Sequence, residues 1–498
     1  MTKTPRRDIT PSNDLALLTV AQIGQADAAA IASGTPGIAL MSAAGAVVFE
    51  AIVNRYPPQP TLVMAGPGNN GGDAYIVAER LRRAGWPVTV AALAPATALK
   101  GDAAWAASKY SGRTVLPTSG SVLDGHTLVV DGLFGAGLSR PLDGVALALV
   151  RAVNERRLAC VAIDIPSGVQ GDSGQILGDA PLCALSVTFF RPKPGHLLLP
   201  GRLHRGELVV GDIGISPSVL NDIKPQIFRN GPALWRDAWR PPQAGDHKYS
   251  RGAVLVYSGS GMTGAARLAS LAARRAGAGL VTVVAPDEAS GIALRAGDAG
   301  TIVVNASKTA DFASHVDDIR FESMLLGPGG GVSLALQHSV LVALKSKRSV
   351  ILDADALTSF SNNPATLFAA IAGPCLMTPH EGEFNRLFNS LKNIINKIDR
   401  VQAAARLSGA TILLKGADTI IASPCGTTII NDNAPPSLAT AGSGDVLAGF
   451  AAGFLAQNLT PLAAGAAAAW LHGAVANRLG KQLIAEDLLH TDLAQLTL

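Results

Sequence analysis

The sequence predicts an α/β protein of two domains, each built around a mostly parallel sheet. The chain has 498 residues, more than one compact core usually holds. Short apolar runs alternate with helical patterns along its whole length. Ala and Gly are abundant, which suits helices that pack closely on a parallel sheet.

In the first half of the chain, apolar runs are followed by turn residues or by helical stretches. This alternation is the pattern of βαβ units in a doubly wound sheet. The expected helices include residues 75–84 and 145–155. The expected strands are Thr61–Gly66, Pro87–Ala92, Thr127–Asp131 and Cys160–Asp164.

A second series of strands follows a break in the pattern. Residues 230–252 hold two tryptophans and a Pro-Pro pair without periodicity, so we expect a linker there. The predicted domains are residues 1–234 and 235–498. The strands expected in the second domain are Ala253–Tyr257, Leu280–Ala285, Ser323–Leu326, Ser349–Asp353, Cys375–Thr378 and Thr411–Leu414.

Composition excludes several classes of function. The formal net charge is only +4 and no long basic run occurs, which argues against nucleic acid as a ligand. The four cysteines lie far apart and form no Cys-x-x-Cys pair, so neither a disulfide framework nor a zinc site is expected. The N-terminus lacks the apolar core of a signal peptide, and the most apolar stretches are rich in Ala and Gly. We therefore expect a cytoplasmic protein without a membrane partner.

The first glycine-rich loop has the pattern of a dinucleotide site. Residues 61–75, TLVMAGPGNNGGDAY, place G-x-G-x-x-G after a strand and before a helix, where backbone can approach a pyrophosphate. No acidic residue ends the second strand, so ordinary hydride transfer is not expected. Asn69, Asn70 and Asp73 are more polar than a turn requires, and they suit a ribose hydroxyl or a hard cation.

Two further strands end in aspartates. Asp131 precedes the glycine-rich loop GLFGAGLSRP, and Asp164 lies three positions before Ser167. Each aspartate alone would read as a loop or helix cap. The carboxyl ends of parallel strands meet at one edge of a sheet, so the three loops together favour a ligand crevice.

With these motifs in order, residues of about 10–225 resemble the NAD(P)H-hydrate epimerase family. The motifs are GPGNNGGDA, DGLFGAGLSRP and DIPSGV, and the one departure is Ala74 where the family usually has Gly. The resemblance implies a Rossmann-like three-layer α/β/α domain with Asp164 as the catalytic acid or base. Lys193 either stabilises charge there or binds phosphate at the surface.

The resemblance also implies the ligands of this domain. A potassium ion would be held by Asn70, Asp131 and Ser167. The hydrated dinucleotide would contact Asn69, Asn70, Gly71, Gly72, Asp73, Gly135, Ala136, Gly137, Leu138, Ser139, Arg140, Pro141 and Asp164.

The second half carries a different glycine loop, LATAGSGDVLAG. Gly442 and Gly444 would let backbone N–H groups point inward at a helix start and form an anion hole. Asp445 would then lie beside a bound phosphoryl group and could take a proton from an attacking hydroxyl. The alternative is an ordinary helix cap. No Walker A motif occurs, so a P-loop mechanism is not supported.

Residues of about 245–480 resemble the NAD(P)H-hydrate dehydratases of the ribokinase superfamily. The matching motifs include LLGPGGG, ILDADAL, MTPHEGEF, LLKGADT and GSGDVLAG. The resemblance implies a ribokinase-like α/β domain, with Asp353 and Asp355 near phosphates and Mg²⁺. Substrate would contact Ala265, Gly329 or Gly331, His380 and Asp445, and the adenine nucleotide would contact Lys415, Gly416, Ala417, Asp418, Thr419 and Gly444.

Together the two halves predict a bifunctional repair enzyme. The first would interconvert the R and S hydrates of NADH and NADPH, and the second would dehydrate the S hydrate with ADP or ATP, ADP being favoured. Alternatives are a small-molecule (vitamin) kinase with a regulatory N-terminal domain and a non-enzymatic scaffold. The resemblance further implies a homo-oligomer.

Overall fold

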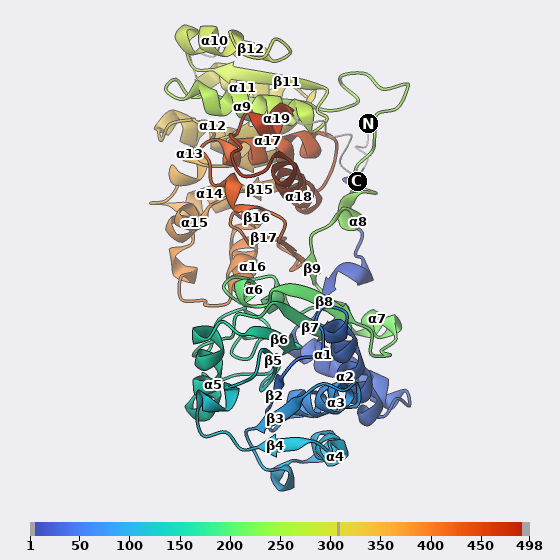
Figure 1. The fold of residues 1–498 in the computed structure, drawn as a ribbon. Coiled ribbons are helices and arrows are strands. Elements are labelled where there is room, and N and C mark those ends of the chain that lie inside the picture. Colours follow the sequence, from blue (N-terminus) through green and yellow to red (C-terminus); the bar gives the residue numbers. More distant parts are fainter. Residues whose placement is uncertain (1–4, 306–308, 491–498) are drawn as a thin grey trace. The chain divides into compact units, whose positions relative to one another are not determined.

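A computed structural model describes residues 5–305 and 309–490, which fall into two compact units. The N-terminal unit spans Ala16–Ile227, and the C-terminal unit combines residues 5–15 with residues 228–490. Both units consist of helices around a largely parallel sheet, which confirms the predicted α/β class (Figure 1).

The N-terminal unit is built on a parallel sheet in the order β4-β3-β2-β5-β6-β7-β8. The four predicted strands are present within about one residue, and the sheet extends further on both sides. The strands are β2 (Thr61–Ala65), β3 (Val88–Ala92), β4 (Arg113–Val115), β5 (Leu128–Gly132), β6 (Ala159–Ile163), β7 (Leu185–Phe189) and β8 (Glu207–Gly211).

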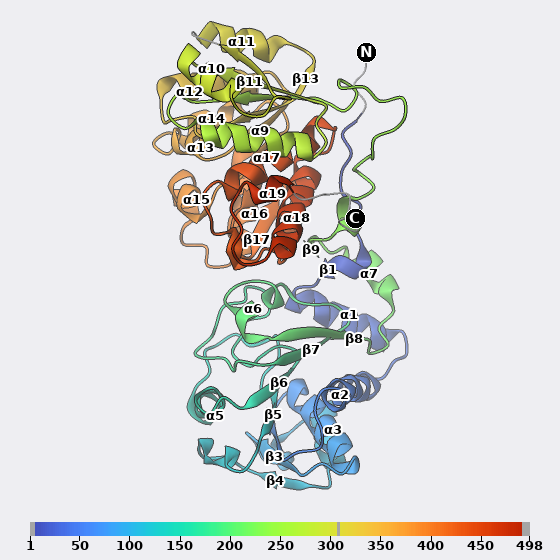
Figure 2. The ribbon, with the colours of Figure 1, turned by 45° about the horizontal axis from the view of Figure 1, so that its top comes forward.

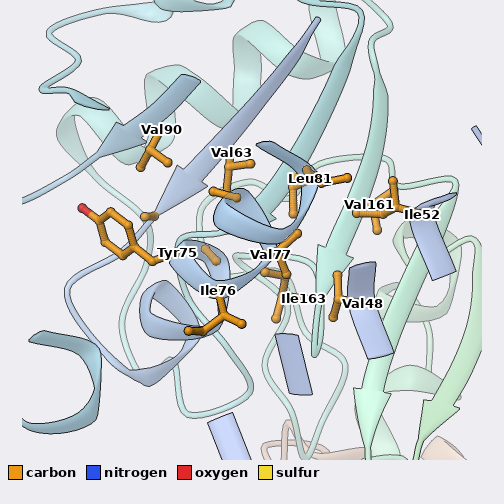
Figure 3. Close-up of a cluster of buried hydrophobic side chains, with 14 of the residues drawn as sticks. Val48, Ile52, Val63, Tyr75, Ile76, Val77, Leu81, Val90, Val161 and Ile163 are labelled. Carbon is orange, nitrogen blue, oxygen red and sulfur yellow. The ribbon is translucent and has the colours of Figure 1, made fainter. Parts of the chain in front are cut away.

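Helices cover both faces of this sheet. Alternate residues of β2 point to opposite sides, so Val63 packs in the cluster with α2, α3 and α4, whereas Leu62 packs in the cluster with α5. Figure 3 shows Val63, Val161 and Ile163 of the sheet against Val77 and Leu81 of α3. The helices are α1 (Val20–Ala32), α2 (Gly37–Val53), α3 (Asn69–Arg83), α4 (Gly101–Lys109), α5 (Gly144–Glu155), α6 (Gly201–His204) and α7 (Leu220–Ile223).

Helix α3 begins at Asn69, six residues before the predicted start at residue 75. Glycine normally disfavours a helix, so the sequence Asn-Asn-Gly-Gly-Asp was expected to be loop. Here Gly71 is required by close packing, because a Cβ at that position would lie 1.8 Å from the Gly66 carbonyl oxygen. Much of the predicted loop is therefore the first turn of α3.

Strands β2 and β5 form the switch point of the N-terminal sheet. They are hydrogen-bonded neighbours, yet the chain continues from β2 toward β3 and β4 and from β5 toward β6. The connections leave these two strand ends in opposite directions and open a crevice between them. Ligands of doubly wound sheets bind at this position.

The C-terminal unit has a larger mixed sheet, in which β9 (Ile227–Arg229) adjoins β18 and the order continues β18-β17-β16-β15-β14-β13-β10-β11-β12. Strands β16, β17 and β18 pair antiparallel, and the pairs between β12 and β16 along this order are parallel. The strands are β10 (Ala253–Tyr257), β11 (Leu280–Ala285), β12 (Ile302–Asn305), β13 (Phe321–Leu326), β14 (Ser349–Leu352), β15 (Cys375–Met377), β16 (Thr411–Leu414), β17 (Thr419–Ala422) and β18 (Thr428–Asn431).

Helices α9 and α17 lie side by side over this sheet (Figure 2). A Cβ at Gly449 would lie 2.3 Å from the Ala269 carbonyl oxygen, so glycine permits the close contact. The helices are α8 (Pro232–Trp235), α9 (Thr263–Arg275), α10 (Glu288–Arg295), α11 (Thr309–Asp317), α12 (Leu334–Lys345), α13 (Asp355–Thr358), α14 (Pro364–Ala370), α15 (Glu381–Leu387), α16 (Lys397–Ser408), α17 (Ser443–Ala456), α18 (Pro461–Leu479) and α19 (Asp487–His490).

Two segments extend the C-terminal unit beyond the predicted division at residue 235. The Arg7 N–H donates to the Asn458 carbonyl at 2.9 Å, and the Thr460 N–H donates to the Arg7 carbonyl at 2.8 Å. Trp235, in the expected linker, is buried with its ring centroid 5.7 Å from that of Trp470. The aromatic side chain anchors this part of the linker in the core.

Candidate active sites

The N-terminal unit contains a cavity of about 660 Å³ at the switch point. Its wall includes side chains from α1, α2 and α3 and the loops after β5 and β6. Of the residues expected to contact substrate, the cavity is lined by Asn69, Asn70, Asp73, Gly135, Ala136, Gly137, Leu138, Ser139, Arg140 and Asp164. Most of the expected contact residues therefore lie at this cavity, although they form only part of its wall.

Three of the expected contact residues do not line the cavity. Gly71 packs on the Gly66 backbone, and a Cβ at Gly72 would lie 2.6 Å from the Met41 methyl carbon. Pro141 is exposed beside the cavity loop. The two glycines let α3 pack closely, which explains their presence without a ligand contact.

Asp164 is held rigidly at the end of β6. It has a positive φ of 66°, a conformation that costs energy for a residue with a side chain. Its Oδ1 accepts hydrogen bonds from Thr188 Oγ1 at 2.9 Å and from Lys193 Nζ, and its Oδ2 accepts one from the Ala136 N–H at 3.2 Å. His196 Nε2 lies 2.9 Å from the Asp164 carbonyl oxygen. The carboxylate has a fixed position facing the cavity.

Lys193 is the cationic partner of this carboxylate. Only 2 % of its surface is exposed, and its Nζ also donates to Thr188 Oγ1 at 2.9 Å. Burial acts to raise the pKa of Asp164, but the charges of Lys193 and His196 and the hydrogen bonds outweigh it and lower that pKa. Of the two roles considered for Lys193, the buried position supports charge stabilisation and not surface binding of phosphate.

Asp131 and Ser167 meet beside the cavity. Asp131 is fully buried, and its two oxygens accept hydrogen bonds from Ser167 Oγ at 2.7 Å and from the Ser167 N–H at 2.8 Å. Burial raises the pKa of Asp131. The Asn70 side-chain amide is buried without a hydrogen-bond partner among the described residues. A buried carboxylate without a basic partner in the described chain, close to a hydroxyl, suits a hard cation.

The sequence did not reveal Asp27 or the apolar part of the cavity wall. Asp27 lies on α1, in an Ala-rich segment without a motif, and it lines the cavity. Met41, Phe189 and Ile213 also line it from α2 and from the ends of β7 and β8. Each of these residues stands alone in an apolar segment. In a single sequence such a residue cannot be distinguished from a residue of the hydrophobic core.

In the C-terminal unit, the glycine loop forms the start of α17 as predicted. Gly442 has φ of 85° and precedes the first helical residue, Ser443. Asp445 lies in the first turn, where free backbone N–H groups attract anions. Burial and the charge of Asp353 raise the pKa of Asp445 to about 6. A carboxyl with this pKa can accept and release a proton near neutral pH.

A lysine and two more acidic residues surround this helix start. Lys415 Nζ donates to Asp353 Oδ1 at 2.8 Å, and it lies 3.4 Å from the position of a Cβ on Gly444. Burial acts to lower the pKa of Lys415, but Asp353 and other acidic residues raise it, so the ammonium stays charged. Asp355 Oδ2 accepts a hydrogen bond from the Gly331 N–H at 2.9 Å.

The residues expected to bind the nucleotide form a turn between β16 and β17. Thr419 Oγ1 donates to the Gly416 carbonyl at 2.7 Å and accepts from the Gly416 N–H at 3.1 Å. Gly416 and Ala417 are exposed, whereas the buried Asp418 pairs with Lys397 at 2.5 Å. The Lys397–Asp418 pair holds the shape of the turn, and Gly416 and Ala417 are its exposed part.

The remaining expected substrate contacts lie in two places. Gly329 packs near Ala265, since a Cβ at Gly329 would lie 3.1 Å from the Ala265 Cβ. His380 precedes α15, and its Nδ1 accepts a hydrogen bond from the Gly382 N–H at 2.9 Å. This hydrogen bond caps α15 and occupies Nδ1, while the His380 side chain is about half exposed. A parallel backbone bridge joins His380 to Lys415.

The fold and these two sites define a two-site α/β enzyme. One site has an ion-paired carboxylate, Asp164, in a switch-point cavity, and the other has a carboxylate, Asp445, in the first turn of a helix that begins with glycines. Among the residues that the structure describes, no helix is long and apolar enough to cross a membrane.

Comparison with known proteins places the chain in a family. Residues 37–195 match the family model described as YjeF-related protein N-terminus, and residues 254–497 match that of NAD(P)H-hydrate dehydratase. The bifunctional NAD(P)H-hydrate repair enzyme Nnr of Moorella thermoacetica is 35 % identical, with 95 % of both chains covered. That of Coxiella burnetii is 33 % identical over 95 % of this chain and 96 % of its own.

A solved structure is similar to the second half alone. The Bacillus subtilis ADP/ATP-dependent NAD(P)H-hydrate dehydratase, co-crystallised with ATP and Mg²⁺, is 27 % identical with a TM-score of 0.43. The match covers 50 % of this chain and 91 % of that one. Because relatives named as bifunctional NAD(P)H-hydrate repair enzymes match nearly the whole chain, the chain belongs to that family, as its motifs predicted.

Proposed function

We propose that this protein returns hydrated NADH and NADPH to their active forms. The N-terminal unit interconverts the R and S hydrates, and the C-terminal unit dehydrates the S hydrate at the expense of ADP or ATP. The main support is Asp445, at an anion-binding helix start beside the Lys415–Asp353 pair. Relatives that match nearly the whole chain are named for this repair.

For epimerisation, Asp164 acts as the acid or base at the carbon that bears the hydroxyl. Its carboxylate is fixed by Thr188, Lys193 and the Ala136 N–H, so it faces the ring without rearranging. Lys193 keeps it ionised and ready to accept a proton. The loop 135–140 lines the same cavity and provides contacts to the dinucleotide.

A potassium ion in this unit would be held by Asn70, Asp131 and Ser167. The support is the buried Asp131 carboxylate, which has no basic partner among the described residues, and the Ser167 hydroxyl beside it. Such an ion would neutralise the carboxylate and attract the substrate's phosphates. Asp131 and Ser167 also fix the cavity loop, because the Phe134 N–H donates to Ser167 Oγ at 2.9 Å.

For dehydration, the C-terminal unit converts a poor leaving group into a good one. Hydroxide leaves poorly from carbon, whereas phosphate leaves readily. Asp445 takes the proton of the ring hydroxyl as that oxygen attacks the terminal phosphoryl group. Phosphate then leaves with the electrons of the C–O bond, and the neighbouring ring carbon loses a proton to solvent, so that the double bond of the dihydronicotinamide is restored. Lys415 balances the negative charge that develops at the helix start.

The adenine nucleotide would bind at the turn of residues 415–419 and at Gly444. Mg²⁺ would be held by its phosphates together with Asp353 and Asp355, because Mg²⁺ commonly takes one or two carboxylates besides phosphate oxygens. When bound, the ion would neutralise phosphate charge. The hydrogen bonds that Asp353 and Asp355 accept, from Lys415 Nζ and from the Gly331 N–H, leave further lone pairs on both carboxylates available. ADP remains the favoured nucleotide.

The kinase alternative is not favoured, because the full-length relatives are repair enzymes and not kinases. Phosphorus NMR with hydrated NADH and nucleotide decides between them: orthophosphate together with NADH supports repair, and a stable phosphorylated product supports a kinase. A cytoplasmic homo-oligomer stays a prediction, which cell fractionation and light scattering test.

A further inference from the structure

The epimerase cavity contains more carboxyl groups than its assigned chemistry uses. Its charged lining comes from six parts of the fold, namely the helices α1, α3 and α4 and the segments that follow β5, β6 and β7. Asp164 and Lys193 form the ion pair described above. The charged residues of the wall are Asp27, Asp73, Asp102, Arg140, Asp164 and Lys193.

Three of these carboxyl groups, those of Asp27, Asp73 and Asp102, make no hydrogen bond or ion pair with the part of the chain that the structure describes. Asp164, by contrast, accepts three hydrogen bonds. Polar groups in a partly buried site are normally paired. Their partner is therefore expected to be the molecule that fills the cavity.

The cavity holds more carboxyl groups around Lys193 than this one ammonium group can neutralise. Three carboxyl groups, those of Asp27, Asp73 and Asp164, act on one another and on this single ammonium. Burial raises the pKa of Asp27, which the Lys193 charge opposes and the Asp164 charge reinforces. The surroundings thus push the pKa values of these carboxyl groups in opposite directions, downward at Asp164 and upward at Asp27 and Asp73, which is the usual arrangement of an acid–base pair.

Asp27 fits the role of the proton donor better than Asp73 does. Burial raises the pKa of both carboxyl groups. Asp73 lies near the start of α3 beside Asn69 and Asn70, among the expected contacts of the dinucleotide. Asp27, by contrast, reaches the same cavity from α1. Asp27 also lies outside residues 37–195, which match the family model.

We propose that Asp27 is a second catalytic residue of epimerisation, paired with Asp164 in one cavity. This inference deepens the proposed function and rests on it. Asp27 donates its proton to the ring hydroxyl, the C–O bond breaks, and water leaves with the bonding electrons. The carbon becomes a cation that the lone pair of the ring nitrogen stabilises.

Water then adds to the other face of the ring. Its oxygen supplies the electron pair of the new C–O bond, and the released proton goes to Asp164. In the reverse direction the two carboxyl groups exchange roles, and between turnovers they exchange protons with solvent. Atoms and electrons balance without an oxidant, a reductant or a further reactant.

The test is the full-length Asp27→Asn variant, assayed for interconversion of the hydrates by proton NMR in water labelled with heavy oxygen. We expect kcat for epimerisation to fall about 100-fold or more, the loss expected when a general acid is removed. Incorporation of heavy oxygen into the hydrate should fall in proportion, while dehydration of purified S hydrate stays unchanged.

A pH profile separates catalysis from structure. The wild-type rate of epimerisation should fall as pH rises through the raised pKa of Asp27, because only the protonated carboxyl can donate a proton. The rate of Asp27→Asn should not show this fall. The other titratable groups facing Asp27 are Asp73, Asp164, Lys193 and, behind Asp164, His196. Asp27→Glu should restore part of the rate.

Glu50→Gln is the matched control, because Glu50 is an exposed carboxylate on α2 of the same unit. Epimerisation by Asp27→Asn within about twofold of wild type would overturn the inference, and so would a raised KM with unchanged kcat. If wild-type protein itself fails to interconvert the hydrates, the proposed function fails and not the role of Asp27 alone.

Discussion

At Asp445, burial and the charge of Asp353 raise the carboxyl pKa to about 6, while the Lys415 ammonium opposes the shift. This balance keeps Asp445 ionised at neutral pH but makes it a stronger base than an exposed aspartate. Asp164 shows the opposite balance, because Lys193 and His196 lower its pKa in spite of burial. Neighbouring charges thus set two aspartates to different proton affinities.

The pKa of Asp445 predicts how the rate of dehydration falls at acidic pH. A base must be ionised, so activity should be complete above about pH 7 and fall as pH drops through about 6, roughly tenfold per pH unit. The measurement is kcat for NADH recovery from S hydrate at saturating nucleotide. A rate that stays constant down to the usual carboxyl range would contradict the role of Asp445 as base.

The ion pair between Lys193 and Asp164 should contribute to the stability of the N-terminal unit. Lys193→Met leaves the buried Asp164 carboxylate without a counter-ion and should destabilise the N-terminal unit by about 3–5 kcal/mol at neutral pH. Because the Asp164 pKa is lowered, this contribution should disappear as pH falls through that pKa.

A double-mutant cycle checks this effect by urea unfolding. The combined Lys193→Met, Asp164→Asn variant removes both charges and should be more stable than Lys193→Met alone. Additive losses would show that the two side chains do not interact.

At the scale of elements, the positions of the sites depend on how helices start and pack. The sequence predicted both glycine loops and the strands before them, because turn residues and apolar runs are local signals. It placed the start of α3 too late, because the contact of Gly71 with the Gly66 backbone is not visible in one sequence. It also missed Asp27, which the fold brings to the cavity from a helix without a motif.

The close packing of α17 on α9 should affect the rate of dehydration, because α17 carries Asp445. Gly449→Ala would place a Cβ 2.3 Å from the Ala269 carbonyl oxygen and push α17 away from α9, at a cost of about 1–3 kcal/mol. We expect a lower unfolding temperature of the C-terminal unit and a lower dehydration rate, because Asp445 moves with the helix.

Gly465→Ala on α18 serves as the control for this change. Its new Cβ would lie 3.3 Å from the Ile421 side chain, which can adjust. Equal effects of the two substitutions on dehydration would refute the special importance of the α9–α17 contact.

At the scale of the whole molecule, each unit has its own sheet and its own site residues. The sequence predicted this division from two series of strands, but the packing of residues 5–15 and Trp235 on the C-terminal unit depends on long-range contacts. Because the two sites share no residue, their activities should be separable.

Removal of potassium tests that separation. Replacing K⁺ with a larger organic cation should reduce epimerisation and leave dehydration of S hydrate nearly unchanged, since Asp131 and Ser167 belong to the N-terminal unit. Asp131→Asn, which removes the buried charge, should make epimerisation insensitive to the exchange. Loss of dehydration alone on potassium removal would contradict this assignment.

The central claim is that one chain repairs both hydrates, and recovery of dihydronicotinamide absorbance from a mixture of R and S hydrates tests it most directly. With ADP or ATP, the wild-type protein should restore absorbance from the whole mixture and release orthophosphate. Asp164→Asn should convert only the S fraction quickly, and Asp445→Asn should convert neither while still interconverting them. A stable phosphorylated product, or no recovery with either nucleotide, would contradict the account.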